Sequence, residues 1–355
     1  MKAVRFHGSR DIRWEDIAAP SGLRPEEVMV RPSLCGICGT DVHEYLDGPH
    51  WTPKTKNPFS GAQLPQILGH EFAGEIVAVG GAVTSLRPGD RVSIQPQVGP
   101  FSDYFGSRRL FQYSPASAVI GLSWPWGGMS ELAVVNEYNA IRLPDSVTDA
   151  QGAMVEPAAV AVQSVDRGGV RTGDTVLVTG GGPIGVLVAM AADAAGAARV
   201  VMSETSPGRR ARLENLGVAS LLLDPRSEGF RQMVRDTTIE GVGVDVAIEC
   251  SGSAVALEQC LDLVRPLGSV VVTGVIHGGA KVDPFQWLLK GLTIQASLAY
   301  PTDIWPRVLA MIASGKLPVE KLVDKTIGGS DVVGEGILPL LDPASTLLKV
   351  LVQTR

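Results

Sequence analysis

Side chains that bind metals stand close together in two stretches of the sequence. Cys38, Thr40 and His43 lie in CGICGTDVHEY, and His70 and Glu71 lie in GHEFAG. A thiolate and two imidazoles with carboxylates nearby form a ligand set that suits Zn²⁺. The spacing by itself leaves other uses of these residues open.

The first stretch also contains a Cys-x-x-Cys pair, Cys35 and Cys38. Such a pair is either redox-active or one half of a structural zinc site. The sequence has no second pair to complete a zinc ribbon, and the motif does not precede a thioredoxin-like βαβ pattern. We therefore expect Cys35 to be a small buried residue.

A glycine-rich turn is the second candidate site. Gly180, Gly182 and Gly185 form G-x-G-x-x-G directly after the apolar run DTVLVTG and at the start of a helical pattern. Such glycines allow a tight turn, let the backbone approach a pyrophosphate, and let helix and strand pack closely. An ordinary strand-to-helix turn is the alternative. Glu204 follows about 20 residues after Gly185. An acid at this distance binds the adenosine ribose in dinucleotide sites, so Glu204 favours that interpretation of the turn.

The charges near Glu204 bear on the choice between NAD and NADP. A carboxylate at this position repels a 2′-phosphate, so we expect NAD. Arg209 and Arg210 follow in the next predicted helix, and arginines near this strand can accept that phosphate in NADP enzymes. Alternatively, these arginines are solvated charges on a surface helix. NADP therefore remains the alternative to NAD.

The pattern of elements changes along the chain. Short strand-like runs separated by Gly and Pro fill residues 1–150 and predict an antiparallel, barrel-like β domain. After about residue 155, apolar strands alternate with helices, which predicts a parallel sheet with right-handed crossovers. The last stretch, from about residue 300, ends in the strand-like run LLKVLVQ. We expect it to fold back onto the first domain.

Composition argues against several classes of partner. The formal net charge is −6, without long single-sign runs, whereas nucleic-acid and anionic-membrane binders carry a basic stripe. The N-terminus is charged where a signal peptide needs an apolar core, and no apolar run is long enough to span a membrane. Four cysteines are too few for a disulfide scaffold in 355 residues. We expect a cytoplasmic protein with a small-molecule partner.

Motifs along nearly the whole chain resemble the zinc-dependent medium-chain dehydrogenase superfamily, in the branch of butanediol and sorbitol dehydrogenases. They are CGICGTDVHEYLDGP, LPQILGHEFAGEIVAVG, PGDRV, MVEPAAVA, VTGGGPIG, ECSG and ASLAYP. The insert WTPKTKNPFSGAQLP resembles butanediol dehydrogenases more than it resembles sorbitol dehydrogenases or ordinary alcohol dehydrogenases. The resemblance implies an α/β fold, with a GroES-like β-barrel catalytic domain (residues 1–158 and 300–355) and a Rossmann doubly wound parallel sheet (residues 159–299).

The same resemblance implies roles for residues around one catalytic zinc. Cys38 and His70 correspond to zinc ligands, and Glu156 in MVEP stands where this branch uses a carboxylate as the third ligand. Glu71 corresponds to a residue behind the metal that can approach it, and Asp41 to the acid that orients His70. The alternatives are a helix N-terminal acid for Glu156 and surface acids for Glu71 and Asp41.

The implied reaction is hydride transfer between an alcohol and a nicotinamide. Zinc acts as a Lewis acid on the substrate oxygen. The alcohol proton reaches water through Thr40, the ribose hydroxyls of the cofactor and His43. Thr40 has an alternative as a helix N-cap before DVHEYL. The cofactor contacts are expected from Gly180, Gly182, Pro183, Ile184, Gly185, Glu204 and Arg209.

One segment departs from the family. Relatives hold a second, structural zinc with four cysteines, but residues 91–131 contain no cysteine, so we expect that zinc to be absent. Aromatic rings fill the place instead, and we expect apolar packing to replace the metal; a substrate wall or subunit contact is the alternative. The rings belong to Phe101, Tyr104, Phe105, Phe111, Tyr113, Trp124 and Trp126.

The sequence therefore predicts a zinc- and NAD-dependent dehydrogenase of a secondary alcohol, a vicinal diol or polyol, acting as a homodimer or homotetramer. A specialised tailoring or sugar-alcohol dehydrogenase with a larger substrate is the alternative enzyme. A non-catalytic dinucleotide-binding protein is a third reading, but it has no need of Cys38, His70, Glu156 and Thr40 together. A zinc-free reductase of the same fold is disfavoured for the same reason.

Overall fold

Two mainly antiparallel sheets are built from the first part of the chain and its last strands. The computed structural model describes residues 1–354. A three-stranded sheet has the order β2-β1-β4, and a seven-stranded sheet has the order β10-β6-β5-β3-β18-β17, with β9 also paired to β3. The strands are β1 (Lys2–Gly8), β2 (Asp11–Asp16), β3 (Glu27–Gly36), β4 (Gln66–Ile67), β5 (Glu71–Val79), β6 (Arg91–Ile94), β9 (Ala133–Asn136), β10 (Ala140–Arg142), β17 (Val323–Gly328) and β18 (Lys349–Gln353).

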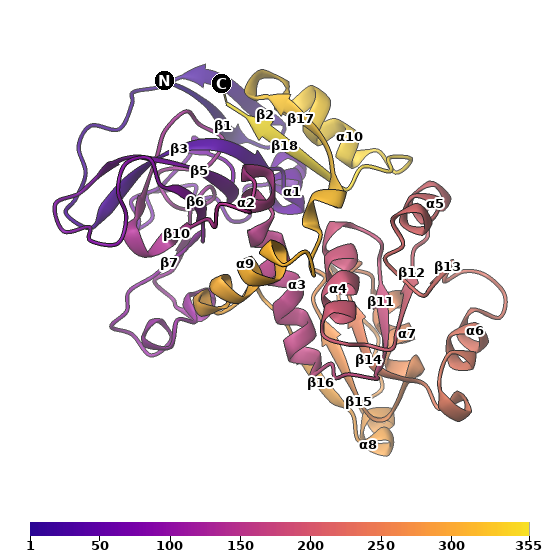
Figure 1. The fold of residues 1–355 in the computed structure, drawn as a ribbon. Helices are drawn as coiled ribbons and strands as arrows, with labels where there is room; N and C mark the ends of the chain where they lie inside the picture. Colours follow the sequence, from indigo (N-terminus) through magenta and orange to yellow (C-terminus); the bar gives the residue numbers. More distant parts are fainter. Residues whose placement is uncertain (355) are drawn as a thin grey trace.

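The end of the chain returns to this first part, as predicted. Strand β18 pairs antiparallel with β3, with Val352 opposite Cys35 and Leu351 opposite Gly36, and it pairs parallel with β17. Figure 1 shows the two termini at the same end of the molecule, with the last strand beside the first ones. The return places Lys349, at the start of β18, next to the end of β3.

The parallel sheet predicted after residue 155 is confirmed. Its order is β13-β12-β11-β14-β15-β16, and its pairs are parallel. Its strands are β11 (Thr175–Thr179), β12 (Arg199–Ser203), β13 (Leu221–Leu223), β14 (Val244–Glu249), β15 (Val264–Val272) and β16 (Thr293–Ala296). The helices are α4 (Pro183–Ala194), α5 (Pro207–Leu216), α6 (Phe230–Asp236), α7 (Ala254–Leu263) and α8 (Pro284–Lys290).

The central strand β11 explains why its sequence is apolar throughout. Val176 and Val178 face a core shared with α3 and α4, whereas Leu177 faces a second core shared with α6 and α7. Both faces of the strand are therefore buried, and alternation with polar residues is lost. Helices covering both faces make this a doubly wound sheet (Figure 1).

A long helix joins the two parts. Helix α3 (Val155–Gly168) packs on α4, and α9 (Trp305–Ala313) packs on α3. The first turn of α3 contains Glu156, which belongs to the functional site described below. Helix α3 therefore connects the core of the parallel sheet to that site. The remaining α-helices are α1 (Gly39–Asp47), α2 (Asp149–Ala153) and α10 (Leu338–Leu341), and the remaining strands are the pair β7 (Gln97–Val98) and β8 (Ala118–Val119).

The aromatic segment packs in part against itself and in part faces solvent. The rings of Phe101 and Phe111 lie 5.1 Å apart edge to face, and both contact Tyr138. Phe111 is fully buried, whereas Tyr104 is 67% exposed. Apolar packing therefore accounts for Phe111, and part of the segment stays accessible.

Among residues 1–354, no helix combines the length and the apolar character needed to cross a bilayer.

Candidate metal and dinucleotide sites

The start of α1 fixes the position of one thiol. The backbone N–H of Cys38 donates to a carboxylate oxygen of Asp41 at 3.0 Å, and the Cys38 thiol donates to the Thr40 hydroxyl at 3.6 Å. Asp41 is buried beneath this first turn. The carboxylate thus holds the backbone from which the thiol projects, and Thr40 lies beside the thiol.

The glycine before His70 is required by crowding. Gly69 has φ +98°, and a Cβ there would lie 2.5 Å from the Cys35 sulfur and 2.8 Å from Met129. Only glycine fits this backbone. The chain then enters β5 with His70 and Glu71 side by side and buried.

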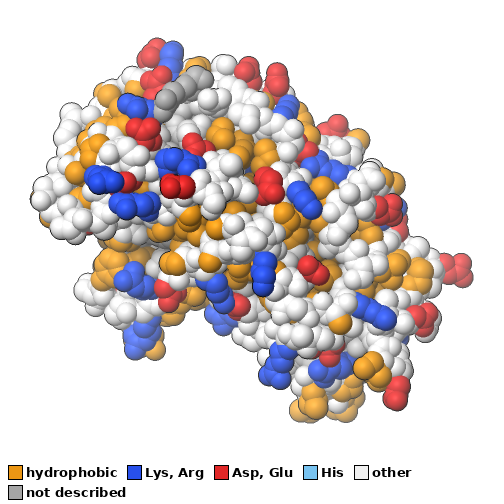
Figure 2. Space-filling model, in the orientation of Figure 1, with side chains coloured by type: hydrophobic (Ala, Val, Ile, Leu, Met, Phe, Trp, Pro, Cys, Tyr) orange, Lys and Arg blue, Asp and Glu red, His pale blue; other side chains and the backbone are white. Residues whose placement is uncertain are grey.

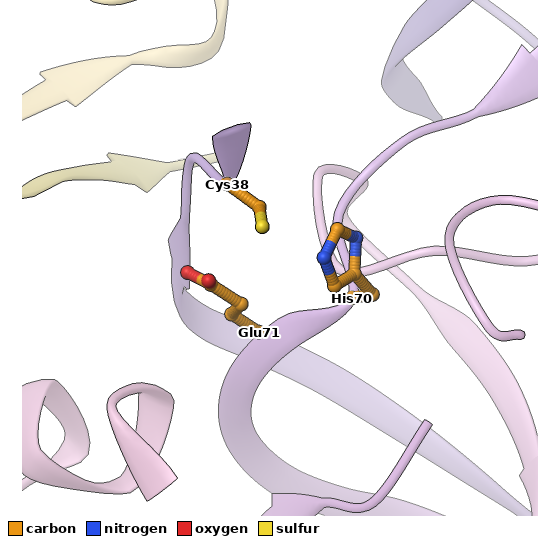
Figure 3. Close-up of side chains that lie close together, drawn as sticks. All are labelled: Cys38, His70 and Glu71. Atoms are coloured by element: carbon orange, nitrogen blue, oxygen red, sulfur yellow. The ribbon is translucent and has the colours of Figure 1, made fainter. Parts of the chain in front are cut away.

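These two elements bring three candidate ligands together. Single ligand atoms of Cys38, His70 and Glu71 all lie within 4.8 Å of one another. Figure 3 shows the Cys38 thiol and the His70 ring facing the same space, with Glu71 beside the strand that leads toward Cys38. Its carboxylate is so close to this strand that a Cβ on Gly36 would lie 2.1 Å from it.

His70 lies in an anionic setting. Burial by itself lowers the pKa of His70, but the negative charges of Cys38, Asp41 and Glu156 raise this pKa well above its usual value. Its Nδ1 lies 3.8 Å from an Asp41 oxygen, and both buried atoms lack a hydrogen-bond partner. Burial also raises the pKa of Asp41 to about 6. A site that favours a proton in this way also favours a divalent cation.

Glu71 is already paired with a buried cation. Lys349 Nζ donates to both Glu71 oxygens, at 2.7 and 2.9 Å, and to the Ile37 carbonyl at 3.1 Å. Burial by itself lowers the pKa of Lys349, but the charge of Glu71 raises it overall, so Lys349 is a cation. Sequence reasoning missed Lys349. A lysine inside the apolar run LLKVLVQ was the available signal, because a buried lysine needs a partner.

Glu156 lies outside the three-residue group and has a different partner. The Tyr300 hydroxyl donates to a Glu156 oxygen at 2.7 Å. Burial raises the pKa of Glu156 to about 7, although the charge of His70 and this hydrogen bond lower it. Burial and the nearby Glu156 raise the pKa of Tyr300 well above its usual value, so the phenol stays protonated. ASLAYP was recognised as a family segment, but the role of Tyr300 was not predicted.

Two further predictions concern Cys35 and His43. Cys35 is fully buried, and burial raises the pKa of its thiol well above the usual value. A redox role needs an accessible thiolate, so Cys35 acts as a packing residue.

His43 lies on the exposed face of α1, and its ring centroid is 6.0 Å from that of His277.

The glycine turn has the three features expected of a dinucleotide site. Gly180 has φ +92°, and a Cβ there would lie 2.8 Å from Ser251. A Cβ on Gly185 would lie 1.9 Å from the Gly180 carbonyl, so the third glycine permits close packing. Around Gly182, the residue before α4, nothing lies within 4 Å of such an atom. This glycine leaves open space at a helix N-terminus.

Glu204 is held at the end of β12 as an anion. It accepts hydrogen bonds from the backbone N–H of Gly181 at 2.8 Å and of Ser206 at 2.7 Å. Burial raises the pKa of Glu204, but these bonds and the charge of Arg209 lower it overall. Arg209 lies 3.4 Å from the carboxylate, and its buried Nε has no partner. The structure thus brings the predicted acid and Arg209 together beside the turn.

The comparisons with known proteins agree with this geometry. The sequence model described as "Alcohol dehydrogenase GroES-like domain" matches residues 24–145, and that described as "Zinc-binding dehydrogenase" matches residues 183–314. A (R,R)-butanediol dehydrogenase of Bacillus subtilis (strain 168) is 37% identical over 99% of both chains. A sorbitol dehydrogenase of Homo sapiens is 32% identical over 89% of this chain and 86% of that protein.

Solved structures give the same result. The crystal structure of 2R,3R-butanediol dehydrogenase from Bacillus subtilis superposes with a TM-score of 0.93 at 35% identity, over 100% of this chain and 99% of that one. A zinc-binding dehydrogenase from Sinorhizobium meliloti 1021, bound to NADP, superposes with a TM-score of 0.88 at 29% identity, over 99% and 98% of the two chains. The GroES-like and Rossmann-like fold inferred from the sequence motifs is thereby confirmed. The chain belongs to the zinc-dependent medium-chain dehydrogenase superfamily, in its butanediol and sorbitol dehydrogenase branch.

Proposed function

We propose that this protein oxidises a secondary alcohol, a vicinal diol or polyol, to the ketone with zinc and NAD. The observation that carries the proposal is the convergence of Cys38, His70 and Glu71 in a chain that also builds a glycine turn with Glu204 beside it. The names of the relatives support a diol or polyol as substrate.

The residues present fit a zinc ion. We assign Cys38, His70 and Glu156 as its ligands, because one thiolate and one carboxylate balance the charge of Zn²⁺ and leave a fourth position open. The unpartnered Nδ1 of His70 faces Asp41, the arrangement that orients a metal-binding imidazole. Glu71 is the weaker candidate for the third ligand, because Lys349 already neutralises it.

Bound zinc supplies a Lewis acid that lowers the pKa of the substrate hydroxyl. The chain supplies the path for the proton that this hydroxyl loses. The Thr40 hydroxyl, beside the Cys38 thiol, would accept this proton and give up its own toward the ribose hydroxyls of the cofactor, and His43 on the exposed face of the same helix would release a proton to water. Such acid–base assistance contributes about 10²–10⁴-fold to the rate.

NAD is the proposed cofactor. The lowered pKa of Glu204 keeps its carboxylate ionised beside the turn, where it accepts ribose hydroxyls and repels a 2′-phosphate. Gly182, Pro183, Ile184 and Gly185 present the N-terminus of α4 to the pyrophosphate. NADP is the alternative, because Arg209 lies beside Glu204 and a related structure holds NADP.

A second copy of this chain is the proposed macromolecular partner. Strand β16 ends the order of the parallel sheet, and unpaired sheet edges favour pairing with another strand. Figure 2 shows hydrophobic side chains at the end of the molecule where α8 lies in Figure 1. We propose a homodimer through this surface; a homotetramer is the alternative. The exposed apolar residues are Leu267, Val275, Phe285, Leu288, Leu289 and Leu298.

We also propose a division into two domains and a location in the cell. The first is the division into residues 1–158 with 300–355 and residues 159–299, which the pairing of β18 with β3 supports. The second is the cytoplasm as location, which the four free cysteines support.

A panel of alcohols tests the proposed function. Purified protein with one zinc per chain is given NAD or NADP and vicinal diols, polyols or simple alcohols, and nicotinamide absorbance is followed. We expect turnover of a diol or polyol with NAD and a higher Michaelis constant for NADP. Turnover of bulky alcohols alone would favour the tailoring enzyme, and dinucleotide binding without turnover of any alcohol would contradict the proposal.

A further inference from the structure

A group of histidines outside the Cys38 cluster gathers at α1. His43 and Asp47 stand four residues apart on this helix, so they share one face. The ring of His277, from the segment between β15 and α8, lies with its centroid 6.0 Å from that of His43. Two segments far apart in the sequence thus bring their imidazoles together at the surface.

A carboxylate and a third imidazole complete this group. His50 Nε2 lies 2.9 Å from an Asp47 oxygen. The hydrogen bond with His50 lowers the pKa of Asp47, and the charges of His50, His43 and His277 lower it further. Three of the five histidines of the chain therefore lie close enough to Asp47 for their charges to act on it, and His50 contacts it directly. All four side chains are exposed.

We propose that His43, Asp47 and His277 form a second metal site, for a divalent transition-metal ion such as Zn²⁺ or Ni²⁺, with His50 within reach as a further ligand. Imidazole suits these ions, and a carboxylate completes a common ligand set. Neither the family models nor the proposed catalytic site assigns a metal to these residues.

The ring separation fits a shared ion. A Zn–N bond is about 2.0–2.1 Å and the ring centroid lies about 1.2 Å beyond the nitrogen, so two imidazoles on one ion have centroids about 5.3 Å apart at a tetrahedral angle and at most about 6.5 Å apart. The observed 6.0 Å lies between these values, so a small movement of the two exposed rings gives the tetrahedral separation. Asp47 would join them by a change of rotamer that gives up its contact with His50, and the bond to the metal would replace that contact.

The second site is weaker than the catalytic one. Within residues 1–354, the group whose ligand atoms all lie within 4.8 Å is Cys38, His70 and Glu71, so the surface site is assembled only on binding. Exposed ligands also pay side-chain entropy to become ordered. We therefore expect Zn²⁺ to fill the catalytic site first as its concentration is raised.

Metal at this site has a functional consequence. It ties α1 to the segment before α8, and it occupies the nitrogen with which His43 would accept a proton. Excess zinc is therefore an inhibitor. This inhibition rests on the proposed function, whereas the binding itself does not.

Equilibrium dialysis of the holoenzyme tests the binding. Protein that holds one zinc per chain is dialysed against increasing Zn²⁺, and bound metal is measured by elemental analysis. We expect a second equivalent in the wild type and an affinity at least about tenfold lower in His277→Ala. His7→Ala is the matched control and keeps the second equivalent, because His7 lies on β1 and pairs with Glu15. No second equivalent in the wild type, or equal affinity in His277→Ala, overturns the proposal.

Two further measurements distinguish failure of the second metal site from failure of the proposed dehydrogenase function. Cu²⁺ bound at the second site gives an electron paramagnetic resonance spectrum with coupling to imidazole nitrogen, which His277→Ala weakens; an unchanged spectrum contradicts the site. Excess Zn²⁺ slows the wild type, and His277→Ala resists it with unchanged basal turnover. If the protein turns over no alcohol, the proposed function fails, while dialysis and spectroscopy still decide on the second site.

Discussion

The carboxylates of Glu71 and Glu156 have different partners, and this difference supports the ligand set proposed for zinc. Glu71 is bonded through both oxygens to the Lys349 ammonium, whereas Glu156 is bonded through one oxygen to the Tyr300 phenol. A buried carboxylate with a full counter-charge gains little from a metal, because removing its partner would leave a buried cation unpaired. Glu156 has no such partner, so its charge is available to Zn²⁺.

The raised pKa of Glu156 gives a pH dependence to zinc binding. With a pKa of about 7, the carboxyl group holds a proton below pH 7, and zinc must displace it. From this group alone we expect the affinity of the apoenzyme for zinc to rise about tenfold between pH 6 and pH 8. Competition with a chelator at several pH values measures it.

The control for this prediction is a pair of conservative variants. Glu156→Gln cannot titrate, so it binds zinc more weakly and has a shallower pH dependence. Glu214→Gln changes an exposed acid on α5 and leaves the wild-type dependence in place. If Glu156→Gln has the same pH slope as the wild type, Glu156 does not ligate the metal.

At the scale of elements, different glycines of the turn between β11 and α4 are needed for folding and for cofactor binding. A Cβ on Gly182 meets nothing within 4 Å, whereas one on Gly185 collides with the Gly180 carbonyl at 1.9 Å. Gly182→Ala should therefore keep the melting temperature and lose affinity for NADH, because the methyl group enters the space for the pyrophosphate.

Gly185→Ala is the comparison for this prediction, and it should lower the melting temperature as well. Fluorescence titration with NADH and thermal unfolding of both variants measure the two effects. Unchanged NADH affinity in Gly182→Ala would show that the pyrophosphate does not lie over this turn.

The same elements show what the sequence can predict. Local patterns predicted the glycine turn, the acid after β12 and the apolar central strand, because each depends on neighbours within one strand-helix-strand unit. The pair of Lys349 with Glu71 joins residues 278 positions apart, and that of Tyr300 with Glu156 joins residues 144 apart. No local pattern reports such pairs, since they depend on β18 pairing with β3 and on how the chain turns after β16.

At the scale of the whole molecule, the exposed apolar residues around α8 give the most direct test of assembly. Leu288 is 75% exposed on α8, and a charge there would be buried without a partner in the proposed dimer. We expect Leu288→Glu to convert the dimer to a monomer, measured by light scattering after size-exclusion chromatography.

Leu338→Glu is the matched control for the dimer. Leu338 is also exposed but lies on α10, in the other part of the molecule. This variant should keep the mass of the wild type. A wild-type monomer, or a Leu288→Glu protein that stays dimeric, would show that this surface does not hold two copies together.

The central claim is a single zinc held by one sulfur together with nitrogen and oxygen ligands. X-ray absorption at the zinc edge of the holoenzyme reports this ligand set directly. We expect one sulfur at about 2.3 Å and the remaining ligands at about 2.0–2.2 Å. Two or more sulfur ligands per zinc would show that the metal binds cysteines besides Cys38 and would rule out the proposed site.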